Sequence, residues 1–299
     1  MIGFLVRARS RGLALVAVLW MVAALTLLVA SLLAVSRAST QSAQSHSALV
    51  QATAAGDAAI QLALVDWRHT PPNPVQRLHG RYQFEGLAID VALTPASGYI
   101  NLNRAPPSLL HDLLLSAGGL DSASAGTLAQ RIVDWRDADD AALDGGDEYA
   151  PYAAAGLAVR PRNGPFLSLE DLLQVAGIGL DLFARIEPLI TVWGGSAGVN
   201  PLAAPEGVLA VLAGGDHGLA ATLAQRRAQD GSTLDTSMLN AGHLSGGSAD
   251  VLHAQATVIM NDGSRIVRGR WLALRVGLDG SPWQSIATEP ARYLPALSN

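Results

Sequence analysis

The chain contains no cysteine, and this absence removes whole classes of site. Disulfide frameworks, thiolate zinc sites and cysteine nucleophiles all require the missing thiol. Lysine is also absent, and charged residues make up only 15% of the chain, with a formal net charge of −5. No overall positive field therefore attracts nucleic acid or anionic lipid. Hydrophobic residues reach 49%, which indicates a folded chain and not a disordered one.

The N-terminal part carries one long run without charge, residues 12–36, bracketed by Arg11 and Arg37. At 1.5 Å per residue, this run makes a helix of about 37 Å, longer than the ~30 Å hydrocarbon core of a bilayer. Arginines precede the run and no acid stands among residues 1–11, which favours a cytoplasmic N-terminus. A cleaved secretory signal is the competing interpretation, but its apolar core spans only about 7–15 residues. The run therefore predicts a single membrane-spanning helix.

The run begins abruptly, and Arg11-Gly12-Leu13 resembles a prepilin leader, in which a short basic segment and a glycine precede the hydrophobic helix. The resemblance implies that prepilin peptidase cuts between Gly12 and Leu13 and that Leu13 becomes a methylated N-terminus. Type IV pilins usually carry Glu at the fifth mature position, where this chain has Ala17. That departure is typical of the K-type minor pseudopilin. Without this carboxylate the subunit offers no partner to the N-terminal amine of a neighbour above it, which suits the tip of a filament.

The helix is expected to continue past Arg37, because apolar residues recur at helical spacing from Leu49 to Trp67. Three prolines, beginning with Pro71, end it. We interpret this as one long helix that lies half in lipid and half on a globular domain. A plain linker helix is the alternative.

Strands are predicted near both ends of the globular part, with helices between them, which indicates an α+β sheet domain with a helical insertion. Residues 81–93 alternate and predict one strand with a bulge at Gly86. Near the C-terminus, Asn261-Asp262-Gly263 is a hairpin signal, because these residues tolerate positive φ. The strands expected there are residues 251–260, 264–276 and 282–288.

An internal repeat lies in the middle of the chain, where residues 100–110 align without gaps to residues 199–209. Each copy has an extended segment with an asparagine, followed by proline where a helix is expected to begin. The block between the copies, residues 105–190, is rich in helical patterns. The two copies therefore look like the entry and exit of an inserted domain.

Three further segments give the resemblance its specificity, because their order and spacing match the K-type minor pseudopilins of type II secretion systems. They are Gly98-Tyr99-Ile100-Asn101-Leu102-Asn103, Ile132-Val133-Asp134-Trp135-Arg136-Asp137-Ala138-Asp139-Asp140 and Pro165-Phe166-Leu167-Ser168-Leu169-Glu170-Asp171-Leu172. With the leader and the second Asn-Pro repeat, the likeness covers nearly the whole chain.

This resemblance implies a pilin-like long N-terminal helix packed on an antiparallel sheet, with a large inserted all-α domain. It implies a protein of the bacterial inner membrane with its C-terminal domain in the periplasm. The expected divisions are a leader at 1–12, the transmembrane part of the helix at 13–36, the periplasmic helix and first strands at 37–103, the inserted helical domain with an acidic loop at 104–190, and the second repeat with the C-terminal strands at 191–299.

A protein of this family is a structural subunit and not an enzyme. The expected role is at the tip of the pseudopilus, in protein export across the outer membrane. The expected partners are minor pseudopilins of I, J and H type, the major pseudopilin and prepilin peptidase, with secreted substrate or the secretin as further candidates. No nucleic acid is expected.

An acidic segment lies in the predicted insertion, with seven acids and one base between Asp134 and Glu148. Oxygen-rich, flexible loops suit Ca²⁺, which accepts 6–8 oxygen ligands with loose geometry. The spacing does not match an EF-hand, so from the residues alone a solvated acidic loop stays open as an alternative. The resemblance favours structural calcium. The expected ligands are Asp137, Asp139, Asp140, Asp144, Asp147 and Glu148.

Two other motifs suggest rival functions. Val175-Ala176-Gly177-Ile178-Gly179-Leu180 resembles a helix-hairpin-helix, and this keeps a membrane-anchored DNA receptor for DNA uptake as the alternative hypothesis. Acids flank this turn, and they would oppose phosphate binding, so a structural turn is the favoured interpretation. Gly194-Gly195-Ser196-Ala197-Gly198 matches the Gly-x-Ser-x-Gly pattern of hydrolases, but an extended segment follows where a nucleophile elbow needs a helix. We predict a loop there.

Overall fold

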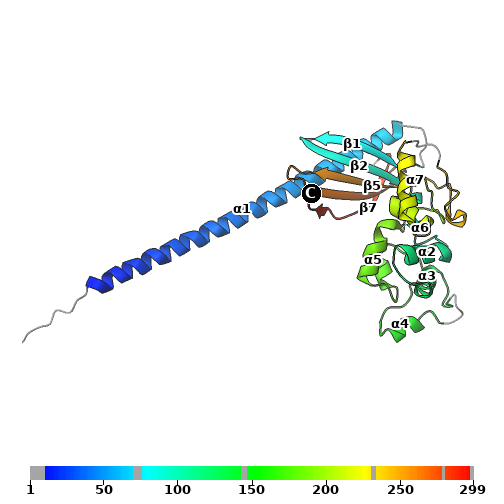
Figure 1. Cartoon of the computed structure of the whole chain (residues 1–299), viewed down its shortest axis with the longest axis horizontal. Coiled ribbons are helices and arrows are strands. Elements are labelled where there is room, and N and C mark those ends of the chain that lie inside the picture. The colour runs from blue at the N-terminus through cyan, green and yellow to red at the C-terminus, as the bar shows by residue number, and fades with distance from the viewer. Residues whose placement is uncertain (1–10, 70–75, 143–146, 230–233, 278–279, 297–299) are drawn as a thin grey trace, which may run out of the picture. The chain divides into compact units, whose positions relative to one another are not determined.

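The computed structural model describes residues 11–69, 76–142, 147–229, 234–277 and 280–296, and the side chains of its first helix over 15–33 and 46–69. The chain divides into two units, Met1–Ala54 and Ala55–Asn299. Figure 1 labels the elements of both. Helix α1, Arg11–His69, runs through both units without a break in its hydrogen bonding.

The first unit contains the apolar part of α1. Its stretch Leu15–Leu33, 19 residues, is long and apolar enough to span a membrane, and none of it is buried within the protein. It lies inside the range predicted from the sequence. Two hydroxyl groups on this stretch are satisfied by the helix itself, since Thr26 and Ser31 each donate to the carbonyl three residues earlier at 2.8 Å. A helix that satisfies its own polar groups meets the main requirement for crossing lipid.

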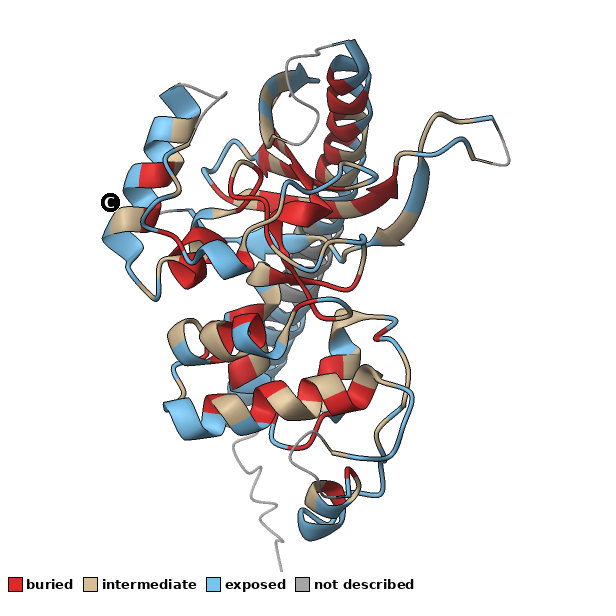
Figure 2. Cartoon of the chain, turned by 90° about the vertical axis from the view of Figure 1, so that its right-hand side faces the viewer, coloured by how far each residue is buried: buried red, intermediate tan, exposed pale blue. Residues whose placement is uncertain are grey.

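The second unit is built on an antiparallel sheet in the order β1-β2-β5-β6-β7, with β8 also paired to β6 (Figure 1). The buried positions of β2 and β5 largely alternate, and Gly56 of α1 lies against Ala256 and Val258 of β5. Figure 2 colours the chain by burial. The described strands are β1 Leu78–Phe84, β2 Leu87–Pro95, β5 Val251–Ile259, β6 Arg265–Ala273, β7 Gln284–Thr288 and β8 Arg292–Leu294.

The prediction of one strand over residues 81–93 is wrong, because this segment turns back on itself. β1 and β2 form a hairpin in which Phe84 pairs with Leu87, and Glu85 and Gly86 make the turn with φ of 49° and 81°. Two consecutive residues at positive φ are the signature of a tight hairpin turn. The apolar alternation continues across this turn, so periodicity alone could not reveal it.

The C-terminal hairpin is confirmed at the predicted place. β5 pairs with β6 from Val251 with Ala273 to Ile259 with Arg265, and Gly263 adopts φ 79° in the turn. The carboxylate of Asp262 accepts hydrogen bonds from both the backbone and the hydroxyl of Ser264. The predicted strand at 282–288 appears as β7, while β8 was not predicted.

In the second unit, α1 packs on the sheet through small residues. A Cβ added at Gly56 would lie 3.4 Å from the side chains of Val258 and Arg268, so the helix backbone approaches the sheet closely. The predicted apolar stripe is buried from Gly56 to Trp67, whereas Leu49 is exposed. The stripe therefore marks the sheet-facing side of the helix.

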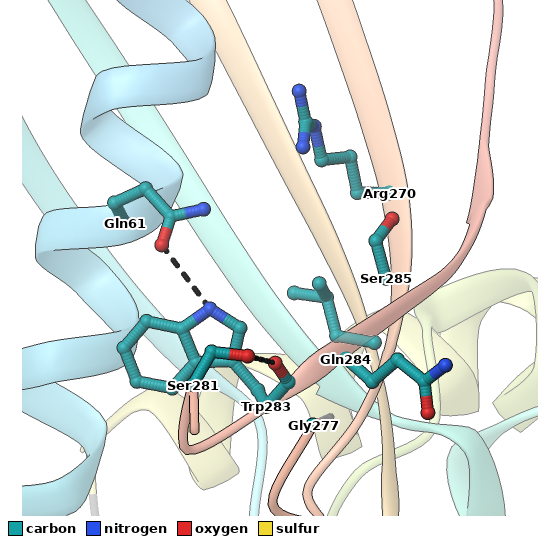
Figure 3. Close-up of a pocket in the computed structure, with 8 residues that line it drawn as sticks. Gln61, Arg270, Gly277, Ser281, Trp283, Gln284 and Ser285 are labelled. Carbon is teal, nitrogen blue, oxygen red and sulfur yellow. Dashed lines mark hydrogen bonds between the residues drawn. The ribbon is translucent and has the colours of Figure 1, made fainter. Parts of the chain in front are cut away.

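Polar contacts fix the position of α1 on the sheet. The Asp57 carboxylate accepts hydrogen bonds from Arg268 (3.0 Å) and from two nitrogens of Arg270 (2.9 and 2.7 Å). Burial raises the pKa of Asp57, but the hydrogen bonds from the two arginines outweigh burial and hold the pKa below its ordinary value. At the edge of the sheet, the Trp283 indole donates to the Gln61 side chain at 3.1 Å, beside a groove of about 470 Å³ (Figure 3).

Between β2 and β5 the chain forms a helical region with its own core. This core contains buried residues from Ile100 to Leu239 and is separate from the sheet face. The helical region extends beyond residue 190, the predicted end of the insertion, because α6 and α7 contribute to the same core. The described elements are η1 Ala96–Gly98, β3 Ile100–Asn101, α2 Pro107–Ser116, α3 Ser122–Arg136, α4 Ala150–Ala154, η2 Leu169–Gln174, α5 Leu180–Ile186, η3 Glu187–Leu189, β4 Ile190–Thr191, α6 Glu206–Leu212, α7 His217–Gln229 and η4 Ala241–His243.

The sequence repeat is also a structural repeat. In each copy, the asparagine side chain accepts a hydrogen bond from the backbone N–H two residues later, at Asn103 and Leu202. Each copy then leads into a helix pair, α2 with α3 and α6 with α7, and each begins with a residue in a parallel pairing. Those pairings join Ile100 with Ile190 and Val199 with Leu244.

One arginine closes each copy, and we call each closure an arginine clamp. Arg136, the last residue of α3, donates to the carbonyls of Leu102 and Ala105. Arg227 of α7 donates to two carbonyls at the equivalent positions of the second copy, at 2.8 and 2.7 Å. The equivalent pairs are Leu102 with Pro201 and Ala105 with Ala204. The two repeated segments therefore form the same local structure. Their sequence predicts only that they mark the two ends of an insertion.

Candidate metal centre

Three carboxylates converge at the C-terminal end of α3. Asp134 lies in its last turn, Asp137 follows its last residue, and Glu148 returns after the acidic loop. Each offers one oxygen, and these oxygens all lie within 4.8 Å of one another. Residues 134 and 137 share one face of the helix end because three residues make almost one turn.

Burial and neighbouring acids act on two carboxylates of this cluster, Glu148 and Asp137, and for Asp137 the charge of Arg136 opposes them in part. Within the described residues, both Glu148 oxygens and one Asp137 oxygen are buried without a hydrogen bond, and Glu148 is only 4% exposed. Burial raises the pKa of Glu148 to about 7, with further contributions from the nearby charges of Asp137 and Asp134. Burial and the charge of Asp139 also raise the pKa of Asp137. Such a site is costly as it stands, and a divalent cation would neutralise it.

Aromatic packing holds the cluster in place. The Trp135 ring stacks on Phe166 with centroids 6.0 Å apart and lies 6.4 Å from the Tyr152 ring. The side chain of Asn103 donates to the Phe166 carbonyl at 3.0 Å and accepts from the Phe166 backbone N–H at 2.8 Å. The first sequence repeat therefore positions the aromatic support of the cluster.

The structure separates the predicted ligands into three groups. Asp137 and Glu148 lie in the cluster. Asp139, Asp140 and Asp147 bond elsewhere: Asp139 and Asp147 accept from backbone N–H groups two residues later, and Asp140 accepts from Asn163. Asp144 lies outside the described residues.

Asp134 was not among the predicted ligands. It is buried on α3, and sequence reasoning placed the site in the loop and not on the preceding helix. The available signal was its spacing of three residues from Asp137 at a helix end. Three carboxylates of this kind suit a hard divalent cation, which prefers oxygen ligands.

The glycine-rich turn before α5 has a structural explanation. Gly177 adopts φ 98°, and a Cβ there would lie 2.7 Å from the Leu128 side chain. Arg131 donates to the carbonyl of Ala176 at 2.9 Å, which ties the turn to α3. The predicted tight turn between helices is therefore confirmed, and its glycine serves packing.

The segment around Ser196 is a loop, as predicted. The Ser196 hydroxyl donates to the Gly198 carbonyl at 2.6 Å and lies 2.7 Å from the Ser245 hydroxyl. The chain continues into the bridge at Val199, so no helix directly follows the serine. The Gly-x-Ser-x-Gly match therefore lacks the strand–turn–helix geometry of a nucleophile elbow.

A Ser–His–Asp series occurs elsewhere, between α2 and η4. The buried His243 ring lies 3.3 Å from the Ser108 hydroxyl through Nε2 and 3.5 Å from an Asp112 oxygen through Nδ1. In the part of the chain that the structure describes, His243 Nδ1 makes no hydrogen bond. This arrangement holds η4 against α2 and is not a hydrogen-bonded catalytic triad.

Comparison with known proteins agrees with these observations. Residues 100–195 match the model of the family described as Type II secretion system (T2SS), protein K. The fold is similar to a chain in the crystal structure of the GspK-GspI-GspJ complex from the enterotoxigenic Escherichia coli type 2 secretion system. The TM-score is 0.55 and the identity 15%, over 86% of this chain and 99% of that chain. No curated protein matches the chain. The predicted resemblance to K-type minor pseudopilins and the predicted α+β fold class are confirmed.

Proposed function

We propose that this chain is the K-type minor pseudopilin at the tip of a type II secretion pseudopilus, and that it takes part in protein export across the outer membrane. The proposal depends on two features that occur together in one chain. Residues 100–195 match the protein K family model, and the N-terminal part of α1 is apolar and exposed. A protein K segment without such a helix would fit a peripheral component. With it, the chain has the parts of a filament subunit.

In this proposal α1 serves first as an anchor in the inner membrane and later as a packing element of the filament. Leu15–Leu33 would lie in the bilayer, with the second unit in the periplasm. Processing between Gly12 and Leu13 would release the leader before assembly. The test is N-terminal mass spectrometry of protein from cells with and without prepilin peptidase. A methylated Leu13 terminus only in the peptidase-positive cells supports the proposal, and processing near residues 34–45 contradicts it.

The proposed partners are minor pseudopilins of the I and J type, which form a complex with GspK in the similar structure. On the part of α1 that belongs to the second unit, Leu62 and Val65 are 50% and 44% exposed and lie on one helical face. Exposed apolar side chains at this spacing suit a neighbouring helix.

The partner proposal can be tested by co-purification of the full chain with I-type and J-type subunits. We expect Leu62→Gln to reduce recovery of the complex. Arg68→Gln, a change at another exposed position of the same helix, is the matched control and should leave recovery unchanged. Equal recovery with both variants would remove Leu62 from the contact face.

We also propose that the carboxylate cluster binds structural Ca²⁺ through Asp134, Asp137 and Glu148. The unpartnered buried oxygens support this proposal, as does the position of the cluster at the start of the acidic loop. A bound cation would neutralise mutual repulsion and fix the loop, so it would contribute stability and not catalysis.

Isothermal titration of the full chain in detergent tests the metal site. We expect Ca²⁺ to bind more tightly than Mg²⁺, because the loop is irregular and Mg²⁺ demands an octahedral site. Glu148→Gln should abolish binding, whereas Glu206→Gln, an exposed acid on α6, should not change it. Calcium binding that survives Glu148→Gln would place the site elsewhere.

A further inference from the structure

Asn163 and Gly164 form the only Asn-Gly pair in the chain, and they lie just before Phe166, whose ring supports the carboxylate cluster. Asn163 adopts φ 50°, and among the described residues the only other non-glycine residue at positive φ is Glu85. Asparagine tolerates this left-handed conformation better than most residues, because its short polar side chain forms hydrogen bonds nearby. The contacts around the pair therefore hold its backbone in an uncommon conformation.

This pair fastens the start of the acidic segment. Asn163 Nδ2 donates to the Asp139 carbonyl and to the Asp140 carboxylate, both at 2.8 Å. The Gly164 N–H donates at 3.3 Å to the carbonyl of Trp135, which lies in the last turn of α3. We call these three hydrogen bonds the Asn163 latch. The latch joins the returning segment to the helix end from which the acidic segment leaves.

An asparagine followed by glycine can lose its side-chain amide to its own backbone. The Gly164 nitrogen attacks Cγ of Asn163, the bond from Cγ to Nδ2 breaks, and ammonia leaves with the proton of the Gly164 N–H. Water then opens the resulting five-membered imide to aspartate or isoaspartate. Glycine favours the attack because it has no Cβ to crowd the nitrogen.

The latch holds both reacting groups. The Gly164 N–H is directed at the Trp135 carbonyl, and the Asn163 amide is fixed by its two acceptors. The reaction therefore requires the latch to open first.

We propose that Asn163 is a deamidation site, protected by the latch, and that its reaction prevents the latch from closing again. An ionised aspartate or isoaspartate side chain offers only acceptors, and it would face the Asp139 carbonyl and the Asp140 carboxylate, which are acceptors as well. Its charge also repels that of Asp140. Each opening of the acidic segment exposes Asn163 to reaction, so modified chains accumulate with time. This inference depends neither on the proposed role in secretion nor on the proposed cation.

The test is peptide mass spectrometry of the full chain, incubated under mildly alkaline conditions in detergent and, separately, in denaturant. A chelator is present throughout, so that bound cations do not contribute. We expect Asn163 to deamidate fastest of the asparagines in denaturant and at least about tenfold more slowly in the folded protein, because only opened molecules react. Gly164→Ala should slow the reaction in both states. The fold has room for this Cβ, whose nearest neighbour would be the Arg162 carbonyl oxygen at 3.8 Å.

Asp140→Ala separates protection by the latch from the general reactivity of an Asn-Gly pair. It removes one acceptor of the latch, so it should speed deamidation of Asn163 in the folded protein about fivefold, the effect of one ordinary hydrogen bond. The rate in denaturant should not change. Glu206→Ala, at an exposed acid on α6, is the matched control and should react as the wild type does. Equal rates for folded wild type and Asp140→Ala, or equal wild-type rates in the folded protein and in denaturant, would overturn the proposal.

The consequence of the reaction can be measured on Asn163→Asp, which reproduces the aspartate product. Hydrogen exchange of the backbone at residues 139–141 should be faster in this variant than in the wild type, because the latch cannot close. Unchanged exchange there would overturn the claim that deamidation keeps the latch open.

Discussion

The carboxylate cluster predicts an unusual dependence of stability on pH. Moving the pKa of Glu148 from 4.5 to about 7 corresponds to at most about 3 kcal/mol. Between these two values the folded protein retains a proton that the unfolded chain has released. The stability of the metal-free protein should therefore fall as pH rises through this window and level off above it.

Calcium should reverse this loss, because the cation stabilises the charged form of Glu148. For a unit of this size, 3 kcal/mol corresponds to about 6–12 °C in unfolding temperature. The assay is thermal unfolding of the full chain in detergent at about pH 5 and about pH 8, with a chelator or with calcium. We expect the stabilisation by calcium to be much larger at the higher pH.

Glu148→Gln provides the decisive comparison. It removes the titrating group, so the chelated variant should match or exceed the wild type at the higher pH and should not respond to calcium. Glu206→Gln should behave as the wild type at both pH values. If the chelated wild type were equally stable at both pH values, or if calcium stabilised Glu148→Gln to the same extent, the reasoning about this cluster would be wrong.

Four further changes test other parts of the structure. Asp57→Asn removes the charged partner of two β6 arginines and should cost about 2 kcal/mol in neutral chemical unfolding. Because the pKa of Asp57 is held low, the wild type should lose its extra stability over Asp57→Asn below about pH 4. A difference in unfolding free energy that did not change with pH would contradict this prediction. Gly177→Ala places a Cβ at φ 98° and 2.7 Å from Leu128, and should lower stability by about 1–3 kcal/mol; an unchanged unfolding midpoint would count against it. Arg227→Met leaves two carbonyls of the second arginine clamp without donors and should cost about 2 kcal/mol by the same assay, with no change refuting the clamp. Leu25→Arg adds a charge to the apolar stretch at about 2.5–3.5 kcal/mol and should lower the membrane fraction on cell fractionation; undiminished recovery there would argue against an anchor.

Local signals predicted the parts of the fold that depend on local chemistry. The Asn-Asp-Gly motif predicted the C-terminal hairpin, because its residues favour the backbone angles that the turn needs. The apolar stripe up to Trp67 gave the face of α1 that packs on the sheet. The hairpin at Glu85 and Gly86 was missed, because the apolar alternation runs through it without interruption.

The candidate site was predicted only in part, for a physical reason. Acidic composition identifies a loop, but which carboxylates lose contact with water depends on packing from distant segments. Trp135 and Phe166, 31 residues apart in the chain, stack beside the cluster, and no local pattern encodes that contact. Asp134 lies in the cluster because α3 ends at Arg136, which places Asp134 in its last turn. Asp140 instead accepts a hydrogen bond from Asn163.

The two arginine clamps carry a consequence for how this protein tolerates change. Both copies have the same arginine clamp. Only the first has an acidic segment between its clamp and β4, the strand that pairs with its start. In the described part of the second copy, η4 leads to Leu244, which pairs with Val199. The second copy therefore shows the repeated framework without the acidic segment. By this comparison, the acidic segment of the first copy is an addition to the shared framework, and we expect that framework to persist when the segment is shortened.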